Sequence, residues 1–536
     1  MKLRFLIRTV VIVSVLLLCT GLGVYSFFRL TAEERRSEFN LYSLVPDDAM
    51  AVLETDRMAD LVHDINQLQC SKDRHFLYIS DIFVFLKKHL SVLLADTPHG
   101  LSRQMDKMLI SFHHPNIPLN QVFYCSLGGG DYELVESLIR KYTDETYPPK
   151  DFTYQGEKIR IYPMTDGRFL SLYLTRDFLV LSFQKRLVEE VIDARRLRRS
   201  LLQQPAFSGV RAGEHVNVAA TLYVRMHSVE MGNPVDSLCA TTRLGEWTEF
   251  DMKFNDHAVY CSGVSYEVDS AQTFINALRR QQAIEGFLGS HLPASTFYFN
   301  RWALSDRASM LGFIASPHYS LSASSSDSLA VADEWREFFN QGGSESVMVC
   351  LFASQDTVAA TPHAVMRIPV RDEVEAERRL RQIAMQASGS SHLSVGFQMQ
   401  GGRCRQYELP INFLFSRLSG LSSSPSSSMY AGFYGGALLL APDVFSIPAY
   451  VAQMKAGSVL EGHSLYEECI GSLSPFYNFM MMADMETVLR QPEKYVQLVP
   501  NFFFRQASFF RHFMLAVQFS CAEGVVYPNV VLLYKG

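Results

Sequence analysis

The sequence predicts an α+β protein in which an N-terminal transmembrane helix precedes two tandem related domains, each a mostly antiparallel sheet with helices on one face. Three observations predict this fold class. The chain has 536 residues, of which 48% are hydrophobic and 19% charged, a composition typical of globular cores rather than of disorder. One long apolar run lies near the N-terminus, and most of the remaining chain can be aligned with itself as two copies.

The apolar run covers residues 9–28 and contains no charge, whereas Lys2, Arg4 and Arg8 precede it. A helix of about 20 residues crosses the roughly 30 Å hydrocarbon core of a bilayer, and basic residues favour its cytoplasmic side. We therefore expect a cytoplasmic tip and membrane anchor at 1–30 and a linker at 31–43. The protein would span the inner membrane once, with a cytoplasmic N-terminus and with the bulk of the chain in the periplasm.

Two other uses of this run stay open. Cys19 follows a short apolar stretch, as a lipid-modified cysteine does, although Leu18 stands where that processing needs a small residue. Cleavage after Gly23, as in a signal peptide, would release the rest of the chain. The length of the run favours an uncleaved anchor over both alternatives.

The internal repeat appears when residues 45–49 are laid over residues 292–296. It divides the chain into a first α+β repeat at 44–290 and a second at 291–536. Each copy opens with a proline-containing turn and an apolar strand. The later strands that match are 108–112 with 347–352, 216–224 with 476–483, and 250–266 with 513–534.

Between these strands, each copy has the same helices and the same hairpin. One helix begins at Asp131 in the first copy and at Asp372 in the second, and each aspartate is placed to cap the first turn. Glu375 would complete a capping box in the second copy. The hairpin of the second copy contains Gly435-Gly436, a pair typical of two-residue turns. A second helix follows each hairpin.

We predict no catalytic, cofactor-binding or metal-binding residue. The three glycines at 128–130 lack a P-loop lysine, and the turn around Ser464 lacks the closing glycine of a nucleophile elbow. His113 and His114 are adjacent, so on a strand they point to opposite faces and cannot easily bind one metal ion. The adjacent carboxylates at 47–48 are not held across a cleft, as general acid–base catalysis requires.

Basic residues at 195–199 follow Glu189 and Glu190 at helical spacing. This pattern predicts a solvated, ion-paired helix face. An anionic lipid head group is the alternative partner for these arginines.

The candidate interaction patch is a phenylalanine-rich stretch of the second copy, where the first copy has the polar segment 241–246. If these side chains are buried, they add to the core. If some are exposed, they would bind a protein, a lipid or the membrane surface. The patch consists of Phe502, Phe503, Phe504, Phe509, Phe510 and Phe513.

An N-terminal anchor, a short linker and the opening Val45-Pro46-Asp47-Asp48-Ala49 together resemble a group of uncharacterised bacterial envelope proteins that carry a domain of unknown function. The resemblance implies a Gram-negative envelope setting and supplies no catalytic residues. The second copy opens without acidic residues, at 292–296.

We therefore expect a non-enzymatic envelope protein whose periplasmic tandem domain binds a protein or an envelope component. A carrier of a lipid or another hydrophobic ligand is one alternative, and a hydrolase whose site is not visible in the sequence is another. The net charge of −6 and the absence of a long basic run argue against nucleic acid as a partner.

Overall fold

The computed structural model describes the chain from residue 39 to its end, with gaps. The described residues are 39–72, 107–113, 120–128, 148–164, 167–210, 218–229, 244–267, 273–286, 289–306, 345–353, 362–388, 394–399, 402–409 and 429–536, with Tyr132, Val135, Glu136, Met310 and Phe338.

The dominant feature of the described chain is one sheet of 20 strands, in which every pairing is antiparallel. The first half of the chain supplies β1 (Ala51–Thr55), β2 (Met108–Phe112), β3 (Gln121–Ser126), β4 (Lys150–Tyr154), β5 (Glu157–Pro163), β6 (Phe169–Leu174), β7 (Phe178–Ser182), β8 (Ala220–Arg225), β9 (Trp247–Phe254) and β10 (Ala258–Tyr266).

The second half supplies β12 (Thr296–Ala303), β13 (Ser346–Ala353), β14 (Pro362–Pro369), β15 (Ser394–Met399), β16 (Gly402–Leu409), β17 (Met429–Phe433), β18 (Ala437–Ala441), β20 (Phe479–Asp484), β21 (Phe513–Ala522) and β22 (Val525–Tyr534). A separate small sheet pairs β11 (Ile284–Glu285) with β19 (Phe476–Tyr477).

The two halves arrange their strands in the same spatial order. From its outer edge inward, the first half runs β4, β5, β6, β7, β3, β2, β1, β8, β9, β10. The second half runs β15, β16, β17, β18, β14, β13, β12, β20, β21, β22. The segments that the repeat alignment matched therefore occupy equivalent places in the two orders.

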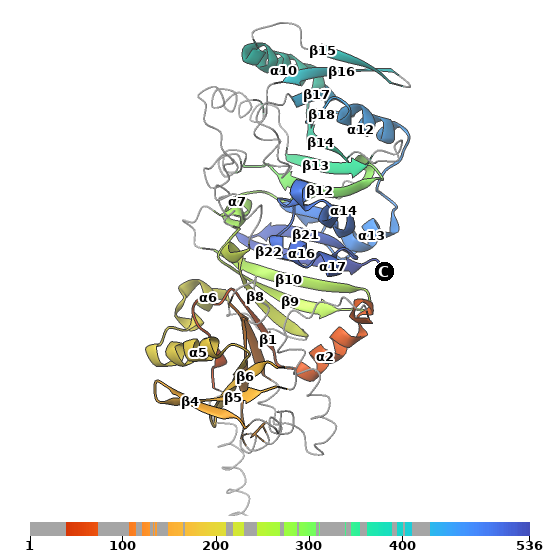
Figure 1. Ribbon diagram of the computed structural model, residues 1–536. Coiled ribbons are helices and arrows are strands. Elements are labelled where there is room, and N and C mark those ends of the chain that lie inside the picture. The colour runs from red at the N-terminus through yellow and green to blue at the C-terminus, as the bar shows by residue number, and fades with distance from the viewer. Residues whose placement is uncertain are drawn as a thin grey trace, which may run out of the picture.

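The halves join edge to edge through β10 and β22, which pair from Ala258–Leu533 to Ser265–Val526. Figure 1 shows these strands side by side at the middle of an elongated molecule. Each half would otherwise expose a long edge strand with unpaired backbone groups. The prediction of two tandem domains, each with a sheet of its own, is therefore wrong, because one sheet runs through both halves.

Helices cover both faces of this sheet, so the prediction of helices on one face is also wrong. In the first half, Val188 and Ile192 of α5 share a buried cluster with strand side chains, whereas Met58 of α2 belongs to a second cluster. Successive residues of β3 alternate between these two clusters, as the side chains of a strand do.

The second half repeats this two-sided arrangement with α12 and α13 on one face and α7, α10 and α14 on the other. The helices are α2 (Met58–Gln67), α5 (Lys185–Leu197), α6 (Pro205–Val210), α7 (Phe274–Arg279), α10 (Glu373–Ser388), α12 (Ser446–Lys455), α13 (Ser464–Gly471), α14 (Met485–Arg490), α15 (Pro492–Tyr495), α16 (Asn501–Arg505) and α17 (Ala507–Phe510).

The predicted hairpin turn at Gly435-Gly436 and the predicted helix cap at Asp372 are confirmed, whereas the predicted capping box is wrong. Gly435 and Gly436 join β17 to β18 with φ values of 59° and 68°, the left-handed conformation that a two-residue hairpin turn needs. Asp372 caps α10 by accepting from the backbone N–H of Glu375 at 3.1 Å. The Glu375 carboxylate does not complete a capping box, because it accepts from Arg378 and Arg379. The matching aspartate, Asp131, lies outside the described residues.

The predicted membrane span at 9–28 also lies outside the described residues. Over the ranges that the structure describes, no helix is both long enough and apolar enough to cross a membrane. This finding contradicts the prediction of a transmembrane, single-pass protein of the inner membrane.

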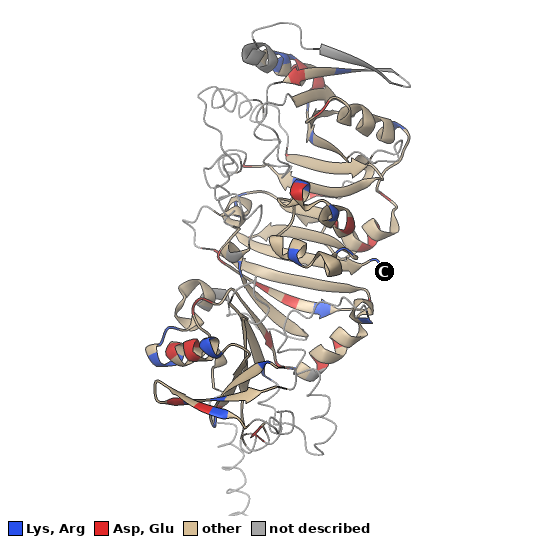
Figure 2. Ribbon diagram, in the orientation of Figure 1, with Lys and Arg blue, Asp and Glu red and all other residues tan. Residues whose placement is uncertain are grey.

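Of the basic residues at 195–199, Arg195 and Arg196 belong to α5, which carries acidic and basic residues side by side (Figure 2), whereas Arg198 and Arg199 follow the end of this helix at Leu197. Lys185 pairs with Glu189 at 2.5 Å and Arg186 pairs with Glu190 at 2.9 Å. Arg195 donates to the Tyr173 hydroxyl. Glu189 and Glu190 therefore pair with residues at the start of the helix and not with the arginines at 195–199, of which Arg195 lies 3.7 Å from Glu157.

Candidate functional site

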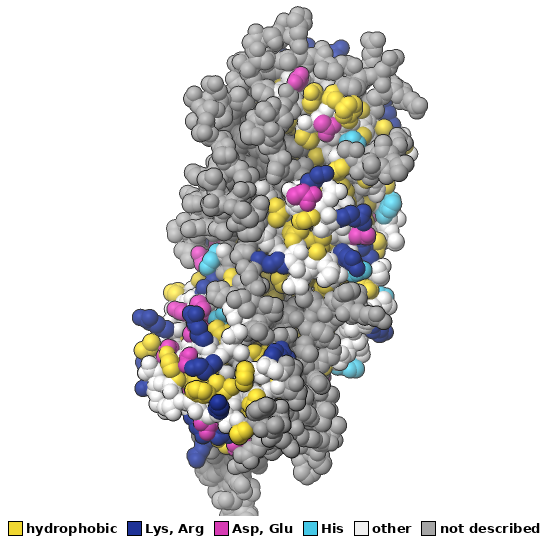
Figure 3. Space-filling view, viewed as in Figure 1, with side chains coloured by type: hydrophobic (Ala, Val, Ile, Leu, Met, Phe, Trp, Pro, Cys, Tyr) yellow, Lys and Arg dark blue, Asp and Glu magenta, His cyan; other side chains and the backbone are white. Residues whose placement is uncertain are grey.

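The phenylalanine patch forms a packed aromatic cluster over α16, α17 and the start of β21. Phe510 and Phe513 are buried, and Phe503 meets Phe510 with ring centroids 4.7 Å apart. Phe502, Phe504 and Phe509 are half-buried and pack against the same core. On the face shown in Figure 3, hydrophobic side chains lie among charged ones. The cluster therefore contributes mainly to the core.

Replacing Phe503 with serine is expected to lower the free energy of unfolding by about 2–3 kcal/mol, because the change removes ring contacts and leaves a void beside Phe510. Chemical denaturation measures this loss. Phe169→Ser is the control, because 60% of the Phe169 side chain is exposed and its loss should cost little. Equal stability of Phe503→Ser and wild type would instead favour a surface role for the patch.

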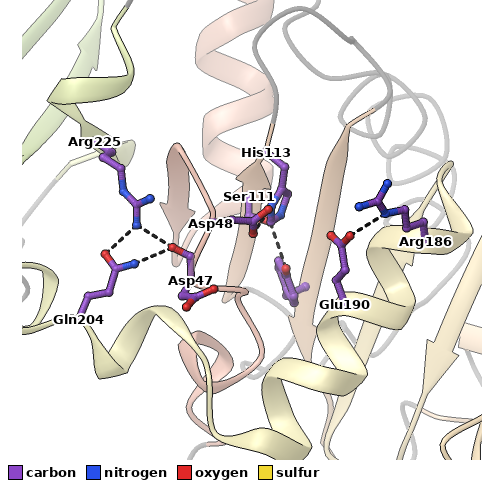
Figure 4. Close-up of polar contacts among 9 residues, drawn as sticks. Asp47, Asp48, Ser111, His113, Arg186, Glu190, Gln204 and Arg225 are labelled. Atoms are coloured by element: carbon purple, nitrogen blue, oxygen red, sulfur yellow. Dashed lines mark hydrogen bonds and ion pairs between the residues drawn. The ribbon is translucent and has the colours of Figure 1, made fainter.

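In the first half, four polar side chains form a series of hydrogen bonds that was not predicted from the sequence. Asp48 Oδ1 lies 3.0 Å from His113 Nδ1, and His113 Nε2 lies 2.8 Å from Ser111 Oγ. Ser111 Oγ lies 3.0 Å from the Tyr124 hydroxyl. One proton arrangement satisfies the whole chain: Nδ1 donates to the carboxylate, Ser111 donates to Nε2, and Tyr124 donates to Ser111. Figure 4 shows Asp48, His113 and Ser111 in this order.

This hydrogen-bonded series has the connectivity of a hydrolase triad, but its serine is not accessible to solvent. Ser111 and Tyr124 have no exposed surface, and His113 is 2% exposed. The Tyr124 hydroxyl occupies the remaining side of Ser111 Oγ. Burial raises the pKa of Tyr124 far above its ordinary value, so that this hydroxyl keeps its proton. A substrate therefore has no route to the serine in this conformation.

The exposed end of the chain is the turn at 45–49, which is also held at its backbone. The carbonyl oxygen of Asp47 accepts from Gln204 Nε2 at 2.6 Å and from Arg225 Nη2 at 2.7 Å. Arg225 also donates to Gln204 Oε1 and lies over the Trp247 ring. Figure 4 shows Asp47, Gln204 and Arg225. The Asp48 carboxylate and the Asp47 backbone carbonyl therefore both help to hold the turn at 45–49 in place.

The second half places different side chains at the equivalent positions. In the first half, Glu54, Leu109 and Tyr124 form a row of directly paired residues across β1, β2 and β3. The equivalent row across β12, β13 and β14 is Arg301, Met348 and Arg367. Because paired residues of antiparallel strands point to the same face, both arginines lie on one face with a single strand between them.

In the first half, the charged residue of the row, Glu54, finds its partners within the protein. Glu54 Oε2 accepts from the Tyr42 hydroxyl at 2.7 Å and lies 3.3 Å from the Tyr223 hydroxyl. Lys107 Nζ lies 3.8 Å from the other carboxylate oxygen of Glu54. The only charge in this row therefore has partners of both kinds, hydroxyl donors and a cation.

In the second half, the two arginines of the row have no oppositely charged partner among the described residues. Arg301 Nη1 donates to the Gly286 carbonyl at 2.8 Å and to the Tyr477 hydroxyl at 2.9 Å. Arg367 makes a long contact of 3.5 Å with the Gly435 carbonyl and interacts with the Tyr450 hydroxyl. Among the described residues, no carboxylate forms an ion pair with either guanidinium.

His291 lies within the electrostatic reach of both arginines. Its pKa is lowered, first by burial and then by the charges of Arg367 and Arg301, whereas Glu461 acts weakly in the opposite direction. Its backbone carbonyl accepts from Tyr450 at 2.7 Å. Arg367 is itself 8% exposed, and burial lowers its pKa. The three basic side chains of Arg301, Arg367 and His291 therefore influence one another electrostatically.

Each of these residues carried a signal in the sequence. Ser111 and His113 are two positions apart on an apolar strand, so they share a face, and Tyr124 faces them from the next strand. Arg301 and Arg367 each interrupt a strongly apolar strand. A charged residue inside such a strand is uncommon unless it has a partner or a function.

The described part of the chain contains no group of three metal-binding side chains. The chain matches no protein-family model, and no curated protein or solved structure is similar to it. Its function therefore has to be inferred from the geometry of its own side chains.

Proposed function

We propose that this protein is a non-enzymatic binding protein that holds a negatively charged ligand in its second half, beside Arg301 and Arg367. One observation carries the proposal: a guanidinium that is 8% exposed, that of Arg367, has no carboxylate partner among the described residues. Buried charges in folded proteins are normally paired.

The energetic argument starts from the cost of burying a charge. Removing a guanidinium from water costs several kcal/mol unless an anion and hydrogen-bond acceptors replace the water. Arginine cannot escape this cost by losing its proton at neutral pH. The retention of the buried Arg367 beside the half-buried Arg301 is explained if a ligand supplies the missing charge.

The two halves support the same conclusion by their difference. They share a strand order, but Glu54 in the first half has donors and a cation, whereas the described partners of Arg301 in the second half are neutral acceptors. The sealed Ser111 supports a binding role rather than hydrolysis for the first half. The half with uncompensated charge is the better candidate for ligand binding.

Replacing Arg367 with methionine tests the proposal on the ligand-free protein. Methionine fills the space of the arginine stem without its charge. We expect the variant to be about 1–3 kcal/mol more stable than wild type after extensive dialysis, because the uncompensated burial cost disappears. Urea denaturation measures the difference.

Arg160→Met is the matched control, because Arg160 pairs with Glu136 at 2.6 Å and with Asp151 at 2.9 Å. Removing that paired arginine should destabilise the protein by about 1 kcal/mol. If Arg367→Met destabilises the dialysed protein as much as Arg160→Met does, Arg367 is a structural residue and the proposed function fails.

A further inference from the structure

We propose that the ligand of this site carries a doubly charged phosphate group, either free inorganic phosphate or a phosphomonoester, and that Arg301 and Arg367 bind it together. This inference rests on the proposed function and specifies the chemistry of its ligand. Its basis is the row Arg301, Met348 and Arg367, which places two permanent positive charges on one face of the sheet, Arg367 buried and Arg301 half-buried.

The spacing of the row suits a single small anion. Strands in a sheet lie about 4.8 Å apart, so the Cα atoms of Arg301 and Arg367, separated by one strand, are roughly 10 Å apart. An arginine side chain is long enough for two such guanidinium groups to meet above Met348. The electrostatic influence of Arg301 on Arg367, and of both on His291, agrees with such convergence.

The donors that remain on these side chains also suit a phosphate. Arg301 directs Nη1 to the Gly286 carbonyl and the Tyr477 hydroxyl, but its Nε and Nη2 reach only Ser346 Oγ, at 3.4 Å. Among the described residues, Arg367 contacts the Gly435 carbonyl at 3.5 Å and interacts with Tyr450. A guanidinium fork binds two phosphate oxygens at once, and a phosphate has enough oxygens for two forks.

The charge balance separates phosphate from carboxylate. Two guanidinium groups require two negative charges, and a phosphomonoester carries about −1.5 to −2 at pH 7. A single carboxylate would leave one buried positive charge uncompensated. The neighbouring groups do not change this balance, because Tyr450 and Tyr477 are neutral and Glu461 forms no ion pair among the described residues.

Isothermal titration calorimetry of the full chain with inorganic phosphate tests the proposal, with sodium acetate and glycerol 3-phosphate in parallel titrations. We expect wild type to bind phosphate and to show no saturable heat with acetate. Arg367→Met and Arg301→Met should each weaken phosphate binding by roughly tenfold or more, because each loses charge-assisted hydrogen bonds. Arg160→Met should bind phosphate as wild type does.

The possible outcomes separate a failure of the phosphate assignment from a failure of the proposed function. Binding of glycerol 3-phosphate as well as phosphate identifies an open site for phosphomonoesters, whereas binding of phosphate alone identifies a closed site for the free ion. Acetate binding equal to phosphate binding, or no phosphate binding by wild type, overturns the phosphate assignment. If Arg367→Met is nevertheless more stable than wild type, the proposed function survives that result.

Discussion

Replacing Gly263 with alanine is expected to lower the free energy of unfolding by about 3 kcal/mol or more. This value is the upper end of the usual cost of overpacking. Gly263 lies opposite Phe250 of β9 in β10, the strand through which the first half joins the second. A Cβ at this position would lie 1.7 Å from the carbonyl oxygen of Glu249 and 2.8 Å from its carbonyl carbon. Both atoms are backbone, so the strands themselves would have to separate.

Gly432→Ala is the matched control, because Gly432 also lies in a strand, β17. Its Cβ would lie 3.3 Å from the Arg405 carbonyl oxygen and 3.5 Å from Ile447, a tight fit that small shifts relieve. Equilibrium denaturation of the two variants should show a large loss for Gly263→Ala and a change within about 1 kcal/mol for Gly432→Ala. Similar stabilities of the two variants would contradict the close approach of β9 to β10.

Replacing His113 with alanine is expected to cost about 3 kcal/mol of unfolding free energy. The change removes the hydrogen bonds to Asp48 and Ser111 and leaves a cavity at a position that is 2% exposed. The buried Ser111 hydroxyl then loses an acceptor, and the cost of such an unmet hydrogen bond adds to the cost of the void.

His257→Ala serves as the comparison, because His257 lies in the exposed turn between β9 and β10. Thermal or chemical denaturation should place His257→Ala near wild type. A stability loss below about 0.5 kcal/mol for His113→Ala would show that the polar chain of the first half does not hold the turn at 45–49.

Local structure was predictable from the sequence because its causes are local. The hairpin with Gly435 and Gly436 follows from backbone conformations that glycine permits, and the cap at Asp372 follows from the unpaired amides of the first helical turn. The two-sided burial was also encoded, since β13 and β18 are continuous apolar runs rather than alternating ones.

The joining of the two halves could not be read from the sequence. The contact between β10 and β22 is made by backbone groups of two edge strands that lie far apart in the chain, and backbone hydrogen bonding leaves no residue pattern. Nothing in either strand specifies whether its edge pairs with solvent, with a helix or with the other half. The prediction of two separate sheets was wrong because these two edges pair with each other.

The candidate site was partly encoded. Arg301 and Arg367 stand out as charges inside apolar strands, but their meeting depends on the order β12, β13, β14 and on a register that aligns both with Met348. His113 was set aside because its neighbour points to the opposite face. Its actual partners, Asp48 and Ser111, come from a distant turn and from a position two residues earlier.

The most direct test of anion binding in the second half compares wild type with Arg367→Met in urea, with and without saturating phosphate. Without phosphate, the variant should be the more stable protein, because it buries no uncompensated charge. With phosphate at about 100 times the wild-type dissociation constant, binding adds about 2.7 kcal/mol to wild type but only about 1.4 kcal/mol to a variant that binds tenfold more weakly, so the stability advantage of the variant should shrink by about 1.3 kcal/mol or more. A stability difference between the two proteins that is the same with and without phosphate would contradict the account.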